Sequence, residues 1–218
     1  MKFKTLLLTA MMSLALAACD DKSKNSTPPS VPDIQKQAPE VKKVSSEEAV
    51  KINIEKNTFN FTTGKETNDY SKKLFVFFDP QCPHCSTLWK NLQDESLKDF
   101  NVVWIPVAVL NEKSVPQAAS ILSASNPVAL FSEHEALISQ NKIDEANQKL
   151  AALEKSNTKE INEKIAKNTK VFLSTGASGV PLTLKLSNNK ERLLGAPGEL
   201  SVTLLKNLVN EQNEFAQK

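Results

Sequence analysis

Two cysteines lie close together in a segment whose residue types can do chemistry, Cys82-Pro83-His84-Cys85. They follow a continuous apolar run, residues 74–78, and precede apolar residues at helical spacing, which predicts a helix that begins at the pair. The unpaired N–H groups of a helix N-terminus stabilise a thiolate. We therefore expect Cys82 to be an exposed attacking thiol. Cys85, one turn inward, would resolve a mixed disulfide by ejecting the bound partner.

His84 lies between the two cysteines, where it can donate a hydrogen bond or a positive charge to the Cys82 thiolate. Both effects stabilise the dithiol relative to the disulfide and make the couple more oxidising. The net direction of exchange stays open among oxidase, isomerase and reductase, because it depends on the reduction potential and on the membrane partner that resets the pair.

The same two cysteines could also serve as metal ligands, as a haem attachment site or as a structural disulfide. A structural zinc site needs four ligands, and the chain has only one further cysteine, Cys19, and two histidines. Attachment of c-type haem needs His directly after the second cysteine, where Ser86 stands. A purely structural disulfide would close too small a ring to stabilise the fold much. Copper(I) capture by the two thiolates remains open, although no methionine cluster accompanies them. We expect no metal site and no cofactor.

The composition excludes several classes of protein. The 218 residues include 27 basic and 25 acidic side chains, so the formal net charge is only +2. A single arginine, Arg192, and the absence of a basic stripe argue against a nucleic-acid partner. Three cysteines are too few to staple a chain of this size, so a hydrophobic core must hold it together.

The amino terminus has the pattern of an export signal. Lys2 and Lys4 precede an apolar run, residues 6–18, that is shorter than the ~20 residues a membrane-spanning helix needs. We interpret residues 1–18 as a signal peptide. The segment that ends at Cys19 resembles the bacterial lipobox, in which the cysteine is lipidated and anchors the mature protein to a membrane. The alternative is an ordinary signal peptide cut before Cys19.

Residues 19–46 are rich in Lys, Asp, Ser and Pro and nearly lack aromatic side chains, which predicts a flexible tether. Asp20 directly after the lipidated cysteine resembles the inner-membrane retention signal of enterobacterial lipoproteins. We therefore expect the globular part on the periplasmic side of the inner membrane.

Residues 47–218 carry the pattern of one α/β domain. The expected order is β-α-β, a helical insertion and then β-β-α. Alternation from Ile52 to Phe61 predicts one or two strands before Gly64, and the many charges of the insertion are expected on a solvated helical face. The further elements are strands at 74–78, 100–110, 180–186 and 191–194, helices at 83–94 and 200–209, the insertion at about 113–172, and a turn at Asn188-Asn189.

Val180-Pro181 stands just before a predicted strand, far from the cysteines in sequence. A cis bond there would leave the backbone of Val180 free to pair with an extended peptide. An ordinary trans proline at the first residue of a strand fits the same pattern.

Residues 77–85 resemble the active-site segment of the bacterial thiol:disulfide interchange proteins of the DsbC/DsbG type. Residues 115–127 are similar to the helical insertion of that family, and residues 194–197 to its end. The resemblance implies a thioredoxin fold with a helical insertion and a cis bond at Pro181. It also implies contact between the substrate and Val180, Pro181 and Pro83.

The chain departs from that family at several points. Little room is left for an amino-terminal dimerisation domain, so we expect a monomer. Val180 replaces the usual Thr and, with Cys-Pro-His-Cys, resembles DsbA. Thioredoxin and DsbA carry a buried acid six residues before the first cysteine, where this chain has Val76. Asp79 is nearer the cysteines, and we expect it to be an exposed loop carboxylate.

These observations predict an enzyme, a lipid-anchored thiol:disulfide oxidoreductase of the Dsb type that acts on cysteines of exported proteins. Its expected partners are those proteins and a membrane redox protein that resets Cys82 and Cys85. The alternative is a copper-handling or binding lipoprotein that uses the two cysteines as ligands.

Overall fold

The computed structural model describes residues 54–186 and 193–211. The signal peptide, Cys19, the tether and the predicted turn at Asn188-Asn189 lie outside these residues. Within them, five strands form one sheet in the order β1-β3-β2-β4-β5. β2 and β3 are parallel, and the other neighbouring pairs are antiparallel. The strands are β1 (Phe61–Gly64), β2 (Lys73–Phe78), β3 (Asn101–Pro106), β4 (Leu182–Leu186) and β5 (Leu193–Pro197).

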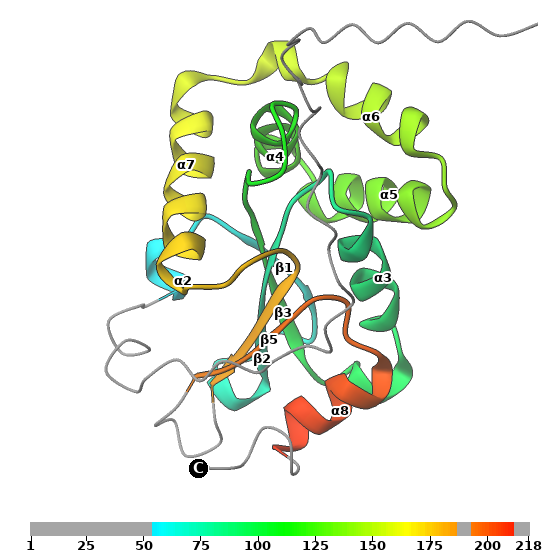
Figure 1. Cartoon of the computed structure of the whole chain (residues 1–218), viewed down its shortest axis with the longest axis vertical. Helices are drawn as coiled ribbons and strands as arrows, with labels where there is room; N and C mark the ends of the chain where they lie inside the picture. Colours follow the sequence, from blue (N-terminus) through cyan, green and yellow to red (C-terminus); the bar gives the residue numbers. More distant parts are fainter. Residues whose placement is uncertain (1–53, 187–192, 212–218) are drawn as a thin grey trace, which may run out of the picture. The chain divides into compact units, whose positions relative to one another are not determined.

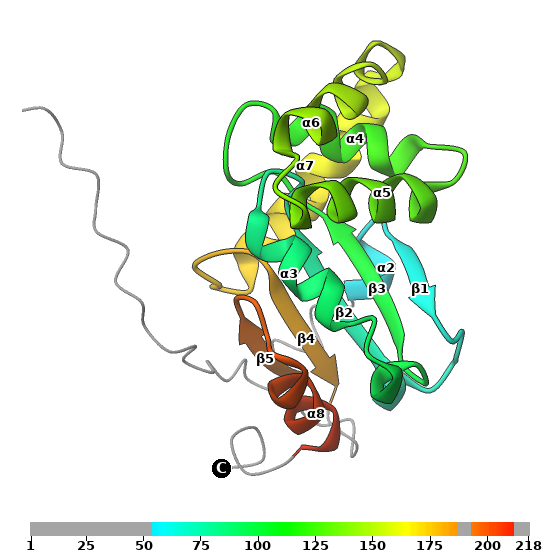
Figure 2. The same cartoon turned by 90° about the vertical axis from the view of Figure 1, so that its right-hand side faces the viewer.

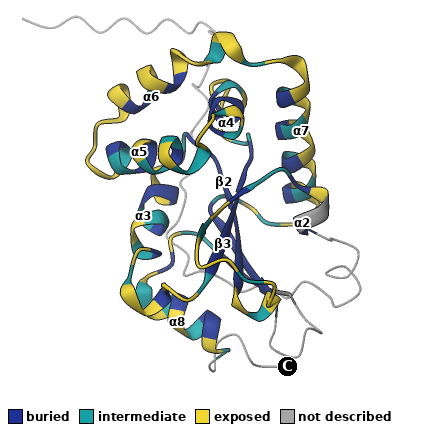
Figure 3. Cartoon of the chain, turned by 180° about the vertical axis from the view of Figure 1, so that it is seen from behind, coloured by how far each residue is buried: buried dark blue, intermediate teal, exposed yellow. Residues whose placement is uncertain are grey.

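β2 is the central strand, and all six of its residues are buried. A strand buried on both faces is a continuous apolar run, because both sets of alternating side chains meet a layer of helices. Figure 1 shows α3, α5 and α8 on one side of the sheet and α2 and α7 on the other. Figure 3 shows the consequence, with buried strands in the middle and exposed residues along the outer sides of the helices.

The first half of the fold is the predicted β-α-β unit. β2 leads into α3 (Pro83–Asn91), and the short 3-10 helix η2 (Glu95–Leu97) then precedes β3. A further 3-10 turn, η1 (Tyr70–Lys72), precedes β2. The aromatic side chains of this half pack against the insertion: the ring of Phe131 lies 4.6 Å from that of Phe78 and 4.6 Å from that of Trp104, centroid to centroid.

The helical insertion lies between β3 and β4, as predicted. It consists of α4 (Ser114–Ser123), α5 (Pro127–Ser139), α6 (Ile143–Ala151), the 3-10 turn η3 (Glu154–Ser156) and α7 (Lys159–Ser174). Two of these helices begin at a capping side chain: that of Asn126 accepts a hydrogen bond from Ala129 N, and that of Thr158 accepts one from Ile161 N. Figure 2 shows α4, α5 and α6 gathered at the end of the sheet toward which β3 runs.

β4, β5 and α8 (Val202–Asn210) complete the order β-α-β, insertion, β-β-α. β4 runs antiparallel to β2, with Leu182 opposite Phe77. The start of β4 therefore lies beside the end of β2, and this brings the segment before Leu182 next to the start of α3.

The predicted strand around Ile54 is wrong, because these residues form a short helix, α2 (Ile54–Asn57). β1 begins only at Phe61, opposite Trp104. Farther along β3 stands Pro106, which has no N–H to donate to a neighbouring strand. At this point of the sheet the side chain of Asn168 forms hydrogen bonds with the backbone of both segments. It accepts from Phe59 N at 2.8 Å and donates to Phe59 O at 2.7 Å and to Pro106 O at 2.9 Å.

Among residues 54–186 and 193–211, no helix combines the length and the apolar character that crossing a bilayer requires.

Gly64 ends β1 with a positive φ of 78°, and a Cβ atom there would lie 2.2 Å from the carbonyl oxygen of Phe100. We expect Gly64→Ala to lower the free energy of unfolding by about 2–4 kcal/mol, the sum of left-handed strain and a backbone clash. Gly176 is the matched control, since its φ is 72° but no atom lies within 4 Å of an added Cβ. Gly176→Ala should cost only about 1 kcal/mol. Equal shifts in the two denaturation midpoints would contradict the clash.

Candidate active site

The cysteine pair lies where β2 passes into α3. Cys82 has extended backbone angles and is the N-cap of α3, and Pro83 fills the first helical position, which needs no N–H donor. Cys82 N donates to Asp79 O at 2.9 Å, and Cys85 N donates to Cys82 O at 3.0 Å. These bonds form a tight turn that holds the Cys82 sulfur against the first turn of the helix, as predicted.

Both cysteines are free thiols. Cys85 is fully buried, and only 5% of the Cys82 surface is exposed. The expectation of an exposed attacking thiol is therefore wrong for this structure. The covering group is the Val180-Pro181 segment: the Cys82 thiol donates to the carbonyl oxygen of Val180 at 3.4 Å, and Val180 itself is only partly buried.

The environment separates the two thiols by acidity. The pKa of Cys82 is lowered to about 7, chiefly by a hydrogen bond from the Cys85 thiol. The N–H groups of Cys85 and His84 and the charge of His84 lower it further, while burial opposes them. Burial, followed by the hydrogen bond with Cys82, raises the pKa of Cys85 well above its ordinary value. At neutral pH about half of the Cys82 sulfur is therefore thiolate, while Cys85 keeps its proton.

His84 has a partner that the sequence did not reveal. Its Nδ1 lies 3.0 Å from Oε2 of Glu199, in the loop between β5 and α8, and both side chains are exposed. The hydrogen bond to Glu199 is the main cause that raises the pKa of His84. The β4–β5 register places Pro197 opposite Leu182. A prediction of this register from the sequence would therefore have placed Glu199, two residues after Pro197, near Pro181 and the cysteines.

Asp79 differs from the sequence-based expectation, because it is fully buried. Its Oδ1 accepts from Gln81 N at 2.9 Å, and its Oδ2 accepts from Val109 N at 2.8 Å and Leu110 N at 3.1 Å. Three backbone donors compensate the loss of water around a carboxylate. Asp79 therefore ties the loop after β2 to the segment after β3.

The insertion holds the same loop through polar side chains. Gln81 Nε2 donates to Gln117 Oε1 at 2.5 Å and to Asn147 Oδ1 at 2.8 Å, which connects the loop to α4 and α6. His134 on α5 donates from Nε2 to the carbonyl oxygen of Pro80 at 2.8 Å. None of these residues was singled out from the sequence, because amide side chains in helices carry no local signal of a distant partner.

The expectation of a solvated charged face on the insertion is wrong at one residue. Glu135 on α5 is only 1% exposed. After burial and Cys82, the charge of Glu135 also contributes to raising the pKa of Cys85.

The Val180-Pro181 peptide bond is cis. Pro181 is buried, and its carbonyl oxygen accepts from Gly198 N at 2.7 Å. The exposed side chains of Pro83 and His84 belong to the same first turn as Cys82. The structure therefore brings together every predicted site residue it describes, and only Cys19 lies outside the described residues.

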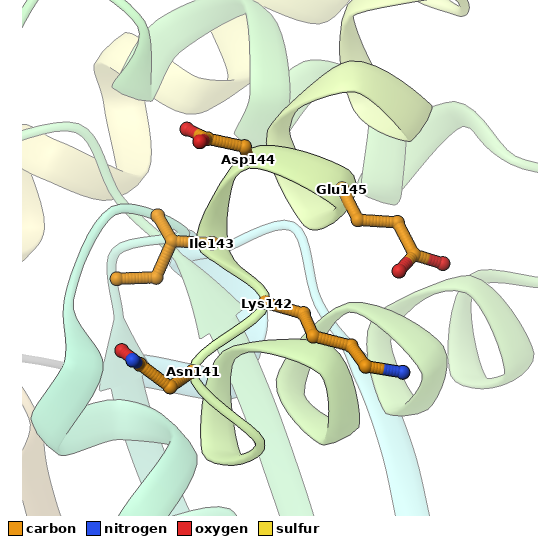
Figure 4. Close-up of a pocket in the computed structure, with 5 residues that line it drawn as sticks. All are labelled: Asn141, Lys142, Ile143, Asp144 and Glu145. Atoms are coloured by element: carbon orange, nitrogen blue, oxygen red, sulfur yellow. The ribbon is translucent and has the colours of Figure 1, made fainter.

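Within residues 54–186 and 193–211, no group of three or more His, Cys, Asp or Glu side chains could hold a metal ion together. A surface hollow lies at the turn from α5 to α6, and Figure 4 shows that its five lining side chains point in different directions. Because they do not converge, this hollow offers no organised binding site.

Comparisons with known proteins reveal the fold. No protein-family model matches the chain, and no curated protein matches it significantly. Solved structures do, at low identity. A periplasmic thioredoxin-like protein from Salmonella enterica serovar Typhimurium is 20% identical with a TM-score of 0.55, over 72% of this chain and 91% of that one.

Two further structures align over more of this chain. The catalytic domain of Proteus mirabilis ScsC is 19% identical with a TM-score of 0.58, covering 79% of this chain and 98% of that one. The thiol-disulfide exchange protein alpha-DsbA2 from Wolbachia pipientis is 19% identical with a TM-score of 0.56, covering 77% and 98%. The predicted thioredoxin fold is confirmed.

We expect His84→Leu to raise the pKa of Cys82 above about 7, because the positive charge that favours the thiolate is lost while the backbone donors remain. Less thiolate would then be present at neutral pH. Ultraviolet absorbance of the thiolate, followed against pH in the reduced protein, measures this directly. An unchanged titration would remove His84 from its role.

Glu199→Gln should lower the pKa of His84, because a carboxylate stabilises the charged imidazolium and an amide does not. The imidazolium would then lose its proton at a lower pH. The chain has two histidines, so an NMR titration can follow His84 beside the buried His134 as an internal reference. Glu95→Gln, which removes an exposed carboxylate paired with Lys98, is the matched control and should leave both histidines unchanged. An unaltered His84 midpoint in Glu199→Gln would contradict the pairing.

Proposed function

We propose that this protein is a thiol:disulfide oxidoreductase that acts on cysteines of exported proteins. The observation that carries the proposal is the separation of the two thiols: the pKa of Cys82 is lowered to about 7, and that of Cys85 is raised well above its ordinary value. A nucleophilic thiolate beside a protonated resolving thiol is what stepwise disulfide exchange requires. The thioredoxin fold, and its occurrence in a protein described as a thiol-disulfide exchange protein, support the same function.

In the reducing direction, the Cys82 sulfur attacks one sulfur of a substrate disulfide, and the other substrate sulfur leaves as a thiolate. Cys85 then loses its proton and attacks the Cys82 sulfur. A Cys82–Cys85 disulfide forms, and the second substrate thiolate leaves. The substrate gains two electrons and the cysteine pair loses two. In the oxidising direction each step runs backwards, beginning with attack of a substrate thiolate on the Cys82 sulfur.

Stabilisation of the Cys82 thiolate favours the oxidising direction, because it stabilises the dithiol relative to the disulfide. Cys-Pro-His-Cys with Val180 before the cis proline supports the same choice through its resemblance to DsbA. We therefore propose net oxidation of substrates, with a membrane redox partner that reoxidises the pair.

The Val180-Pro181 segment and Pro83 are proposed to dock the substrate. In the free protein the Val180 carbonyl accepts from the Cys82 thiol. Once Cys82 loses its proton, that carbonyl has lost its donor and can accept an N–H from an extended substrate backbone. The exposed ring of Pro83 lies beside the same sulfur, within the first turn of α3.

We further propose that residues 1–18 direct export, that lipid on Cys19 anchors the protein and that residues 19–46 tether the domain of residues 47–218. In this arrangement a monomer works on the periplasmic side of the inner membrane. Its site would lie within reach of both exported chains and a membrane redox partner.

Replacing the cysteines separately tests the assignment. Cys82→Ser should reduce disulfide exchange with a model substrate to the uncatalysed background, because a serine hydroxyl is not ionised at neutral pH. Cys85→Ser should accumulate a mixed disulfide on Cys82, visible as a mass increase that a reductant reverses. Full insulin-reducing or dithiol-oxidising activity in Cys82→Ser would overturn the function.

Tight one-to-one copper(I) binding without exchange would favour the copper-handling alternative. A thiol-trapping gel shift in cells gives the direction: a mainly oxidised pair supports the oxidase and a reduced pair contradicts it.

A further inference from the structure

Glu135 is a buried carboxyl group without a structural explanation. It is 1% exposed, and neither carboxylate oxygen has a hydrogen-bond partner among residues 54–186 and 193–211. Burying an ionisable group without partners costs several kcal/mol in the charged form. A leucine or glutamine could fill the same volume at a lower free-energy cost of burial. Packing alone therefore does not explain why a carboxyl group is present.

The position of Glu135 in the fold connects it with the cysteine pair. Glu135 lies on α5, which packs against α3, the helix whose first turn contains Cys85. The adjacent residue, His134, is hydrogen-bonded to the carbonyl of Pro80 in the loop that precedes Cys82. Glu135 therefore lies on a helix that packs against α3 and is hydrogen-bonded to the active-site loop, and it is buried as Cys85 is.

The other titratable groups around the pair are already engaged. The carboxylate of Asp79 accepts three backbone N–H groups. The ring of His134 donates to Pro80 O, and burial lowers its pKa. Val76, six residues before Cys82, cannot carry a proton. Among the described residues near Cys85, Glu135 is thus the buried acid whose oxygens are uncommitted.

We propose that Glu135 exchanges a proton with the Cys85 sulfur during disulfide exchange, so that a helix of the insertion supplies the acid and base of the resolving step. The inference rests on the proposed function. In the reducing direction the Glu135 carboxylate takes the proton of the Cys85 thiol, and the resulting thiolate attacks the Cys82 sulfur and releases the substrate thiolate. In the oxidising direction Cys85 leaves as a thiolate and receives the proton of the Glu135 carboxylic acid.

The electrostatics of the site suit this exchange. Burial raises the pKa of both Glu135 and Cys85 well above their ordinary values. Burial thus lets Glu135 keep a proton at a higher pH than an exposed carboxyl group does, as a group that returns a proton to a thiolate must. Without burial, the carboxyl group would be far too acidic to hold a proton at neutral pH.

The charge of Cys82 couples this proton to the chemical step. A Cys82 thiolate and the Asp79 carboxylate both raise the pKa of Glu135. When Cys82 enters a mixed disulfide its negative charge disappears, and the pKa of Glu135 must then fall. The carboxylic acid then releases its own proton to solvent more readily, and the carboxylate that remains can accept the proton of Cys85. Cys82 and Asp79 are the ionisable groups whose charges act on Glu135. Glu135 acts in turn on Cys85, and His134 lies beside it on the same helix.

The test separates attack from resolution. Full-length protein with Cys19→Ser, so that only Cys82 and Cys85 react, is reduced and mixed in stopped flow with a chromogenic aromatic disulfide. Attack by Cys82 releases the first coloured thiolate, and resolution by Cys85 releases the second. Glu135→Gln should leave the first phase within about twofold and slow the second by about 100-fold near pH 7, the usual contribution of a positioned acid or base. The deficit should shrink as pH rises, because Cys85 then loses its proton to solvent.

Glu133→Gln is the matched control. Glu133 lies on the same helix, but it is half-exposed and pairs with Lys149, so both phases should keep the wild-type rate and pH profile. Glu135→Asp keeps a carboxyl group and should retain much of the second phase. If Glu135→Gln does not fold, Glu135→Asp is the variant on which the proposal is tested. An unchanged second phase in Glu135→Gln, or loss in Glu135→Asp with no recovery at high pH, would overturn the proton-exchange role. Loss of the first phase in the Cys19→Ser protein, or its survival after a further Cys82→Ser change, would instead refute the proposed function.

Discussion

The constraint on which the rest of this structure depends is the burial of β2 on both faces. A strand with no polar face needs a layer of helices on each side, and it needs a partner strand on each edge to satisfy its backbone. β3 and β4 are those partners, one parallel and one antiparallel. The end of β2 consequently meets the start of β4, and the Cys82 sulfur meets the carbonyl of Val180. The geometry of the site is thus a by-product of sheet topology.

The helical insertion is both a structural and a chemical part of the site. Gln81 is held by amide groups of α4 and α6, and Pro80 by His134 of α5. These bonds connect the turn before Cys82 to three helices of the insertion. After burial and Cys82, the charge of Glu135 on α5 also contributes to raising the pKa of Cys85. This chain has Val76 where thioredoxin and DsbA carry a buried acid, and in our proposal Glu135 supplies an acid from another element.

Burial and charge act in opposite directions on neighbouring groups here. The Cys85 thiol, and after it the N–H groups of the first turn of α3, donate to the Cys82 sulfur and lower its pKa, whereas Cys85, fully buried, has its pKa raised by desolvation. Two chemically identical side chains three residues apart thereby acquire different tasks. The pairing of His84 with Glu199 keeps the imidazolium charged to higher pH, while the carboxylate partly offsets the field of that charge at the sulfur.

The sequence alone determined the features that depend on near neighbours. These features depend on residues only a few positions apart. They are the cysteine spacing, the order of the elements, the helix that begins at Pro83 and the caps at Asn126 and Thr158. The tertiary structure decided the burial of Asp79 and Glu135, the helix at Ile54 and the pairing of His84 with Glu199. The last of these joins residues 115 positions apart. Whether a charged side chain is solvated or buried depends on which distant elements pack over it, and no local pattern contains that information.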